Sequence, residues 1–243
     1  MTARDMQIEF ERLVQLANPQ FDYQSKLDSD TIFYFINAAQ ERYIKQSFIN
    51  TDSVKKDSNS YKRLIDMCKA LIVNKTLTDN ISGLEYQYVK TFKLPSNDND
   101  KFYIYLSSYS SIIDLRDNKS KIANNFLLSA EDIEKVLVTN SNKPILRNPG
   151  VVLSGTPGYS SINVYFDLYT TLNSCNITYI RKPLDINVIS SNDTTQECEL
   201  DSNIHRELVE SAVDMFITEG AYRLSASPSK HNENNDNNKD SNQ

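Results

Sequence analysis

The sequence predicts an α+β protein in which helices at both ends of the chain enclose a β-rich segment. Apolar residues recur at spacings of three and four before residue 83 and after residue 200, as in helices buried on one face. Between these regions the period changes to two, as in half-buried strands. We therefore expect a helical bundle made of residues 1–83 and 200–225, an inserted antiparallel β region at 84–199, and a disordered tail at 226–243.

The first predicted helix begins after Thr2. Thr2 and Asp5 have the spacing of a capping pair, and Met6 and Phe10 open an apolar face. Asn18-Pro19 ends this helix, because proline disfavours the helical conformation of the residue before it.

A second helix is expected to start near Asp28-Ser29-Asp30, which supply several N-cap oxygens. Its apolar residues spread beyond one stripe, so we expect it to be buried between neighbouring helices or other subunits. The polar stretch at 50–60 predicts a loop. Helical spacing then predicts a third helix from Tyr61 to Ile72.

Alternating apolar and polar residues predict the strands, which we expect at 84–94, 102–106, 111–115, 162–168 and from 177 to Pro183. Residues 129–132 fit the opening of a helical turn, whereas a strand at 133–138 is favoured by the β-branched Val136 and Val138.

The remaining predicted segments are a glycine-containing loop, a closing helix and a polar tail. Gly150, Gly155 and Gly158 predict an irregular loop on the β region. A closing helix is expected from about 202 to 224, capped by Asp201 or Ser202, and packed back onto the first three helices. The polar residues after it cannot bury apolar surface, so we expect them to be disordered in isolation.

Composition and charge argue against a tight DNA-binding protein and against a membrane-spanning protein. The 243 residues carry a net charge of −6 and are 39% hydrophobic. No basic face is evident, which argues against tight DNA binding but is compatible with a surface that DNA slides past. We expect no membrane span and no signal peptide, and therefore synthesis in a cytoplasm.

The residues that commonly carry chemistry do not form a recognisable site. Of the two histidines, His231 falls in the tail and His205 in the first turn of the closing helix, where we expect it to be partly exposed. Cys68, Cys175 and Cys198 are widely spaced, which predicts reduced, buried or half-buried thiols. We predict no catalytic residue, no cofactor, no metal site and no enzymatic activity.

The Asp98 and Asp100 pair and the many tyrosines are best explained by structural roles and not by chemistry. Asp98 and Asp100 are typical of a solvated turn. The 14 tyrosines are compatible with a face that covers a sheet or with a protein interface, with either Tyr103 and Tyr105 or Tyr165 and Tyr169 expected to line one strand face.

Four stretches together resemble a known family. They are residues 1–12 (MTARDMQIEFER), 28–43 (DSDTIFYFINAAQERY), 177–183 (ITYIRKP) with 198–200 (CEL), and 205–213 (HRELVESAV). In this order they resemble the head–tail connector proteins, also called ring or adaptor proteins, of crAss-like short-tailed bacteriophages. The segment at 84–170 matches no family that we recognise.

The resemblance implies a structural virion protein. Such connectors combine a helical bundle, a β region and an extended C-terminal segment. They form rings, commonly of twelve copies, beneath the portal. The expected partners are the portal protein, the next tail ring, further copies of the chain, and genomic DNA that passes through the channel without specific binding.

The resemblance also suggests where the portal is contacted. The segment that reaches into the portal would begin at the end of the closing helix, at Tyr222, Arg223, Leu224 and Ser225. The alternatives are another tail-tube or stopper component, distinguished by whether it binds the portal directly, and a glycan-binding virion protein.

Overall fold

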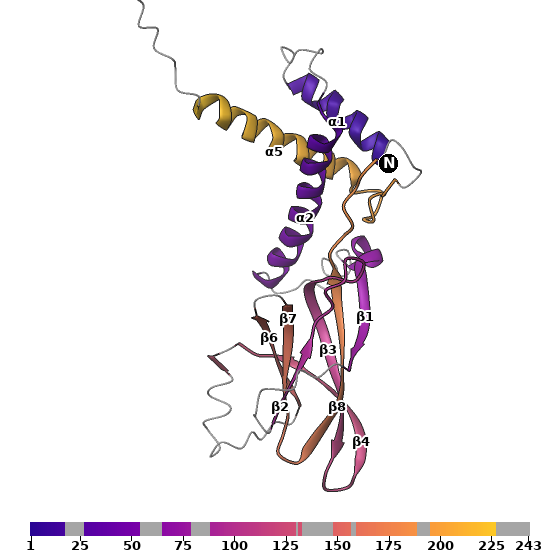
Figure 1. Cartoon of the computed structure of the whole chain (residues 1–243), viewed down its shortest axis with the longest axis vertical. Helices are drawn as coiled ribbons and strands as arrows, with labels where there is room; N and C mark the ends of the chain where they lie inside the picture. Colours follow the sequence, from indigo (N-terminus) through magenta and orange to yellow (C-terminus); the bar gives the residue numbers. More distant parts are fainter. Residues whose placement is uncertain are drawn as a thin grey trace, which may run out of the picture.

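The computed structural model shows a mixed α+β protein with helices at one end and two packed sheets at the other (Figure 1). It describes residues 1–17, 27–53, 65–78, 88–129, 131–132, 148–156, 159–188 and 195–226. The predicted α+β class is confirmed at this level. The predicted disordered tail lies beyond Ala226, outside the described residues.

Three long helices form the upper part in Figure 1: α1 (Ala3–Ala17), α2 (Ser29–Ser53) and α5 (His205–Ala226). The predicted capping pair is present, since Asp5 N donates to Thr2 Oγ1 and Thr2 N donates to Asp5 Oδ2. Helix α2 continues to Ser53, so the loop predicted at 50–60 begins too early.

The closing helix contacts α1 and α2, two of the three N-terminal helices against which it was expected to pack. The Phe216 ring on α5 packs edge-on against Phe10 of α1 at 5.8 Å and against Phe35 of α2 at 5.4 Å between centroids. The bond from Asn203 N to Asp201 Oδ1 lies in the turn before α5, which begins at His205, so Asp201 does not cap the helix as predicted.

The predicted third helix ends in a strand. Residues 65–67 are helical and a 3-10 turn follows at Lys69–Leu71, but β1 runs from Ile72 to Leu77. All six residues of β1 pair with β8, a strand about a hundred residues away. The prediction that Ile72 continues a helix is therefore wrong, and the β region begins at Ile72 instead of residue 84.

The strands form two four-stranded sheets. Sheet A has the order β1-β8-β3-β4 and is antiparallel throughout. Sheet B has the order β2-β7-β6-β5, with one parallel pair between β5 and β6. The remaining bounds are β2 (Val89–Lys93), β3 (Phe102–Asp114), β4 (Lys119–Asn124), β5 (Phe126–Leu127), β6 (Gly150–Thr156), β7 (Tyr159–Tyr165) and β8 (Thr170–Arg181).

Two strand predictions need correction. The expected strands at 102–106 and 111–115 are one strand, β3. The loop predicted around Gly150 and Gly155 is instead strand β6, which pairs with β7 along its length. A Cβ atom at Gly150 would lie 2.4 Å from Cδ1 of Leu128, so any larger residue there would have to push that side chain aside. The strand predicted at 133–138 lies outside the described residues, although Ser129 Oγ accepts from Asp132 N, as at a helix start.

Two buried clusters form the core. The first lies among α1, α2, α5 and the upper ends of β3 and β8, and the second fills the space between sheets A and B. Strand β3 contributes to both: Tyr103 and Ile104 pack against the first cluster, while Tyr105 packs against the second. Register shifts in β3 on both sides of Ile104 and Tyr105 produce this change of face, so the prediction that Tyr103 and Tyr105 share a face is wrong.

The described residues that follow β8, 182–188 and 195–200, fix the helices to the sheets. Asn37 on α2 bonds both backbone groups of Ile186: its Nδ2 donates to Ile186 O at 3.1 Å, and Ile186 N donates to its Oδ1 at 2.8 Å. Glu199 accepts from Leu184 N and from Arg181, both at 3.0 Å. We call residues 182–188 and 195–200 the connecting segment.

Candidate functional site: an uncharged sheet face

One face of sheet A points away from the second core cluster and carries no charged side chain. The pairing of the four strands fixes its members, because residues directly opposite in adjacent strands share a face. They are Asn74, Thr76, Ser107, Tyr109, Ser111, Ile113, Ser120, Ile122, Asn124, Thr171, Ser174, Asn176 and Thr178. We call these thirteen residues the uncharged face.

The face is ordered in rows across the strands. One row runs Thr76–Asn176–Tyr109–Asn124, and in it Thr76 Oγ1 hydrogen-bonds to Asn176 Oδ1. Ile122 protrudes from the edge strand β4 with 76% of its surface exposed. The face therefore combines hydroxyl and amide groups with a few accessible apolar side chains.

The alternate residues on the same strands point inward. Ser110, Ile112 and Cys175 are buried between the sheets. Lys121 also lies on the inner side of β4, where its Nζ donates to Asp114 Oδ2 at 3.0 Å. Strand alternation thus removes the lysines of β4 from the uncharged face.

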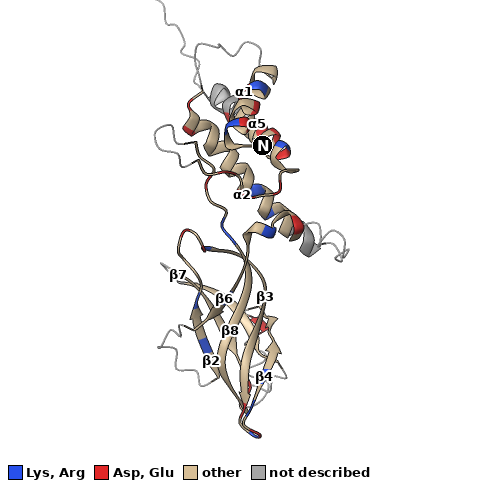
Figure 2. Ribbon diagram, turned by 90° about the vertical axis from the view of Figure 1, so that its right-hand side faces the viewer, with Lys and Arg blue, Asp and Glu red and all other residues tan. Residues whose placement is uncertain are grey.

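The charged groups of the sheets gather elsewhere. Figure 2 shows β8 and most of β3 almost without acidic or basic residues, whereas the β3–β4 turn is charged. At that turn the Asp114 carboxylate accepts from Arg116 Nε at 3.1 Å, Arg116 Nη2 at 3.0 Å and Lys121 Nζ at 3.0 Å. These donors hold the pKa of Asp114 well below its ordinary value.

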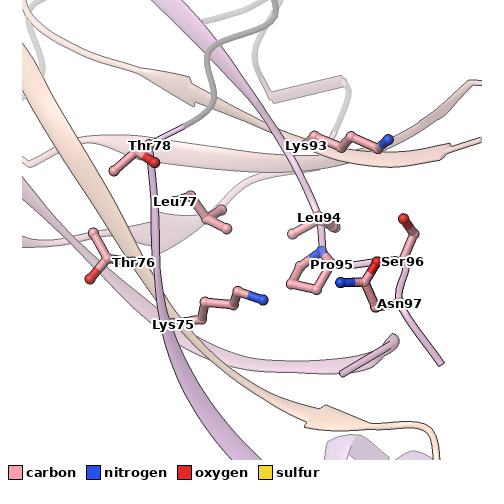
Figure 3. Close-up of a pocket in the computed structure, with 9 residues that line it drawn as sticks. All are labelled: Lys75, Thr76, Leu77, Thr78, Lys93, Leu94, Pro95, Ser96 and Asn97. Carbon is pink, nitrogen blue, oxygen red and sulfur yellow. The ribbon is translucent and has the colours of Figure 1, made fainter. Parts of the chain in front are cut away.

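A shallow pocket of about 280 Å³ lies between the edge strands β1 and β2 (Figure 3). Leu77 and Leu94 face its interior, and Lys93 extends away from them. Lys75 Nζ bonds to Asp100 Oδ2 at 3.0 Å, while Lys93 Nζ lies 5.7 Å from the centre of the Tyr159 ring. The two lysines diverge and each has a partner, so they do not form a convergent anion site.

The histidine prediction is wrong in one respect. His205 is buried, with only 5% of its surface exposed, because the start of α5 is covered by the N-terminal residue. Its Nε2 donates to Leu200 O at 2.9 Å, because a carbonyl oxygen can only accept, while Nδ1 lies 3.0 Å from Met1 O and 3.2 Å from the Met1 amino group. His205 therefore links the N-terminal residue Met1, the connecting segment at Leu200 and the start of α5.

The three cysteines are free, as predicted: Cys68 and Cys175 are buried and Cys198 is half-buried. Burial raises the pKa of both Cys68 and Cys175 to about 11, which keeps the thiols protonated and unreactive. Within the described ranges, no three His, Cys, Asp or Glu side chains are grouped as a metal site would require.

The structure also locates the two aspartates of the predicted turn and the tyrosine pair Tyr165 and Tyr169. Asp98 is exposed in the predicted turn, and Asp100 is half-exposed and paired with Lys75. Tyr165 lies in β7, but Tyr169 lies in the turn before β8, where the Arg116 guanidinium sits 5.3 Å from its ring centre. Tyr165 and Tyr169 therefore do not line one strand.

The portal-contact residues expected from the resemblance, Tyr222, Arg223, Leu224 and Ser225, belong to the last turns of α5. The backbone there is described, but the side chains are not.

Sequence reasoning missed the uncharged face, since its residues come from four strands whose register only the fold sets. Among the helices that the structure describes, none is apolar over a length sufficient to cross a membrane.

No protein-family model matches the chain, and no curated protein matches it.

Proposed function

We propose that the chain is a structural virion protein that forms a ring beneath the portal of a short-tailed phage, connects the capsid to the tail and extends the DNA channel. The proposal combines the family resemblance with one structural observation, the uncharged face. In this proposal the three helices and the turn before β1 form the helical bundle of the connector plan, and the β region projects from it.

The uncharged face carries the structural part of the proposal. The whole chain is 24% charged, so about three of thirteen surface residues would be expected to carry charge. Protein interfaces are depleted in lysine, glutamate and aspartate and enriched in tyrosine. A face with no charge and with Tyr109, Ile113 and Ile122 is typical of a surface that contacts protein.

The stretches that resemble connectors also lie together. Residues from all of them belong to the first core cluster: Phe10 from the first stretch, Ile32 from the second, Ile180 and Leu200 from the third, and Leu208 from the fourth. Stretches separated by more than 130 residues in sequence thus build one packing unit. This supports the view that their combined order reflects a shared fold element and not chance similarity.

The test is reconstitution with the cognate portal. Purified chain is mixed with the portal ring, and the mass of the complex is measured by mass photometry beside each component alone. We expect a discrete complex with one copy of the chain per portal subunit, commonly twelve. Absence of a complex well above micromolar concentration would reject the connector assignment in favour of a more distal tail-tube or stopper component.

A glycan array distinguishes the remaining alternative. Hydroxyl and amide side chains also suit sugars, so a glycan-binding virion protein would retain specific sugars in this assay. We expect no specific retention.

A further inference from the structure

We infer that the uncharged face is contacted by a second copy of this chain, through an area too small to hold two copies together in dilute solution outside a ring. This inference rests on the proposed function, because it names the partner of the face in the ring. The contact is heterologous, so the face meets a different surface of the neighbouring copy.

A surface without charged groups suits contact between two copies of an acidic chain. Each chain carries a net charge of −6, so identical copies repel one another at long range. Two copies approach with least electrostatic penalty where neither an acidic nor a basic group has to be desolvated. The uncharged face is such a region, whereas the exposed side of α5 carries four charged residues, Arg206, Glu207, Glu210 and Asp214.

The nature of the side chains also suits contact with protein. Ile122 and Ile113 offer apolar area, and Tyr109, which is paired with Asn124 on one side and Asn176 on the other, offers a large amphipathic ring. These groups sit on a paired sheet, so little backbone entropy is lost when they are covered.

The size of the face sets the strength of the contact. A stable interface uses about 20–30 residues on each side, whereas the uncharged face supplies thirteen. One such contact alone is therefore weak. In a closed ring every copy makes two contacts, and a template such as the portal raises the effective concentration of neighbours. The chain is accordingly monomeric in dilute solution and associates on the template.

The test places a charge at the centre of the face. Ser111→Lys changes a central residue on β3, and Ile122→Lys changes the exposed edge residue on β4. Ser96→Lys, in an exposed turn outside the face, is the matched control. Thermal melting of each variant establishes that it is folded before association is measured.

Two measurements separate this inference from the proposed function. Sedimentation velocity of the chain alone, up to millimolar concentration, reports self-association without portal. Mass photometry with portal reports ring loading. We expect Ser111→Lys and Ile122→Lys to weaken both by about tenfold or more, since a buried unpaired charge opposes the contact, and Ser96→Lys to match wild type.

The outcomes are distinct. If folded Ser111→Lys and Ile122→Lys associate and load like wild type, the inference is overturned while the connector assignment stands. If wild type does not load on the portal but self-associates in a way that Ser111→Lys abolishes, the face is a self-contact and the connector assignment fails. If wild type shows neither association, the inference is wrong.

Discussion

Asp114 shows how a single carboxylate fixes the turn at the far end of the sheets. It is buried, and it receives both prongs of the Arg116 guanidinium and the Lys121 ammonium, while Arg116 also covers the Tyr169 ring. At the turn itself, Asn118 adopts a left-handed conformation with φ of 51°, which asparagine tolerates better than most residues. The turn is thus held by charge as well as by backbone geometry.

This arrangement predicts a pH dependence. Because the folded pKa of Asp114 lies below its unfolded value near 3.8, its ionised form stabilises the fold above that value. The stabilisation is lost as the pH falls through the folded pKa. Asp114→Asn should therefore lower the melting temperature at neutral pH, and the difference from wild type should shrink as the pH falls below about 4.

Thermal melts of both proteins between neutral and acidic pH check this expectation. Asp117→Asn is the matched control, because Asp117 is exposed, its contact with Lys121 is longer at 3.7 Å, and asparagine Oδ1 can still accept the hydrogen bond from Lys119 N. A difference between wild type and Asp114→Asn that stays constant with pH would contradict the assignment.

At the scale of elements, Phe10 lies on the buried face of α1 together with Ala3, Met6 and Val14. Phe10 is fully buried and meets Phe216 of α5, whereas Ile8 on the same helix is 56% exposed. Phe10→Ala should lower the free energy of unfolding by about 3–5 kcal/mol, because a large cavity remains in a packed core. Ile8→Ala should change it by less than about 0.5 kcal/mol. Urea unfolding of the two variants measures both values, and equal effects would contradict the observed packing.

The connecting segment depends on Asn37. This one side chain satisfies the N–H and the C=O of Ile186, which is itself buried. Asn37→Ala leaves both backbone groups without this partner, so we expect a loss of about 1–3 kcal/mol in the free energy of unfolding. Asn97→Ala, in an exposed turn, is the control. Faster hydrogen exchange at Ile186 in Asn37→Ala would locate the effect, and an unchanged exchange rate would refute it.

Sequence pattern predicts those elements whose apolar period is long and uninterrupted. The buried faces of α1 and α2, the cap at Thr2 and the strand at β7 follow from spacing alone. Strand β1 was not predictable in this way, since Cys68, Leu71 and Ile72 keep a helical spacing. Its partner β8 is distant in sequence, and tertiary pairing overrides local preference.

The same reasoning explains why the site was missed. Glycines in β6 suggested a loop, but both Gly150 and Gly155 pair with β7 in the strand, and Gly150 packs closely against Leu128. The members of the uncharged face are set by strand register and by the irregularities of β3, neither of which can be read from a single sequence. The sequence contains the residues of the face but not their juxtaposition.

For the whole molecule, the C-terminal segment is the proposed link to the portal. Truncation at residue 226, which removes 226–243, should abolish or strongly weaken loading on the portal ring while leaving the melting temperature unchanged. Mass photometry and thermal melting of the truncated chain measure the two quantities. If the truncated chain loads normally, the role assigned to this segment is wrong.

The pairing of Ile72 with Ile180 has an evolutionary consequence. The chain enters the sheets at the start of β1 and leaves them at the end of β8, and these two points are neighbours in sheet A (Figure 1). An inserted module whose ends meet can be lengthened, shortened or exchanged without moving the helices that flank it. The sheets can therefore change without disturbing the helical framework, and residues 84–170, which match no family that we recognise, lie inside this module.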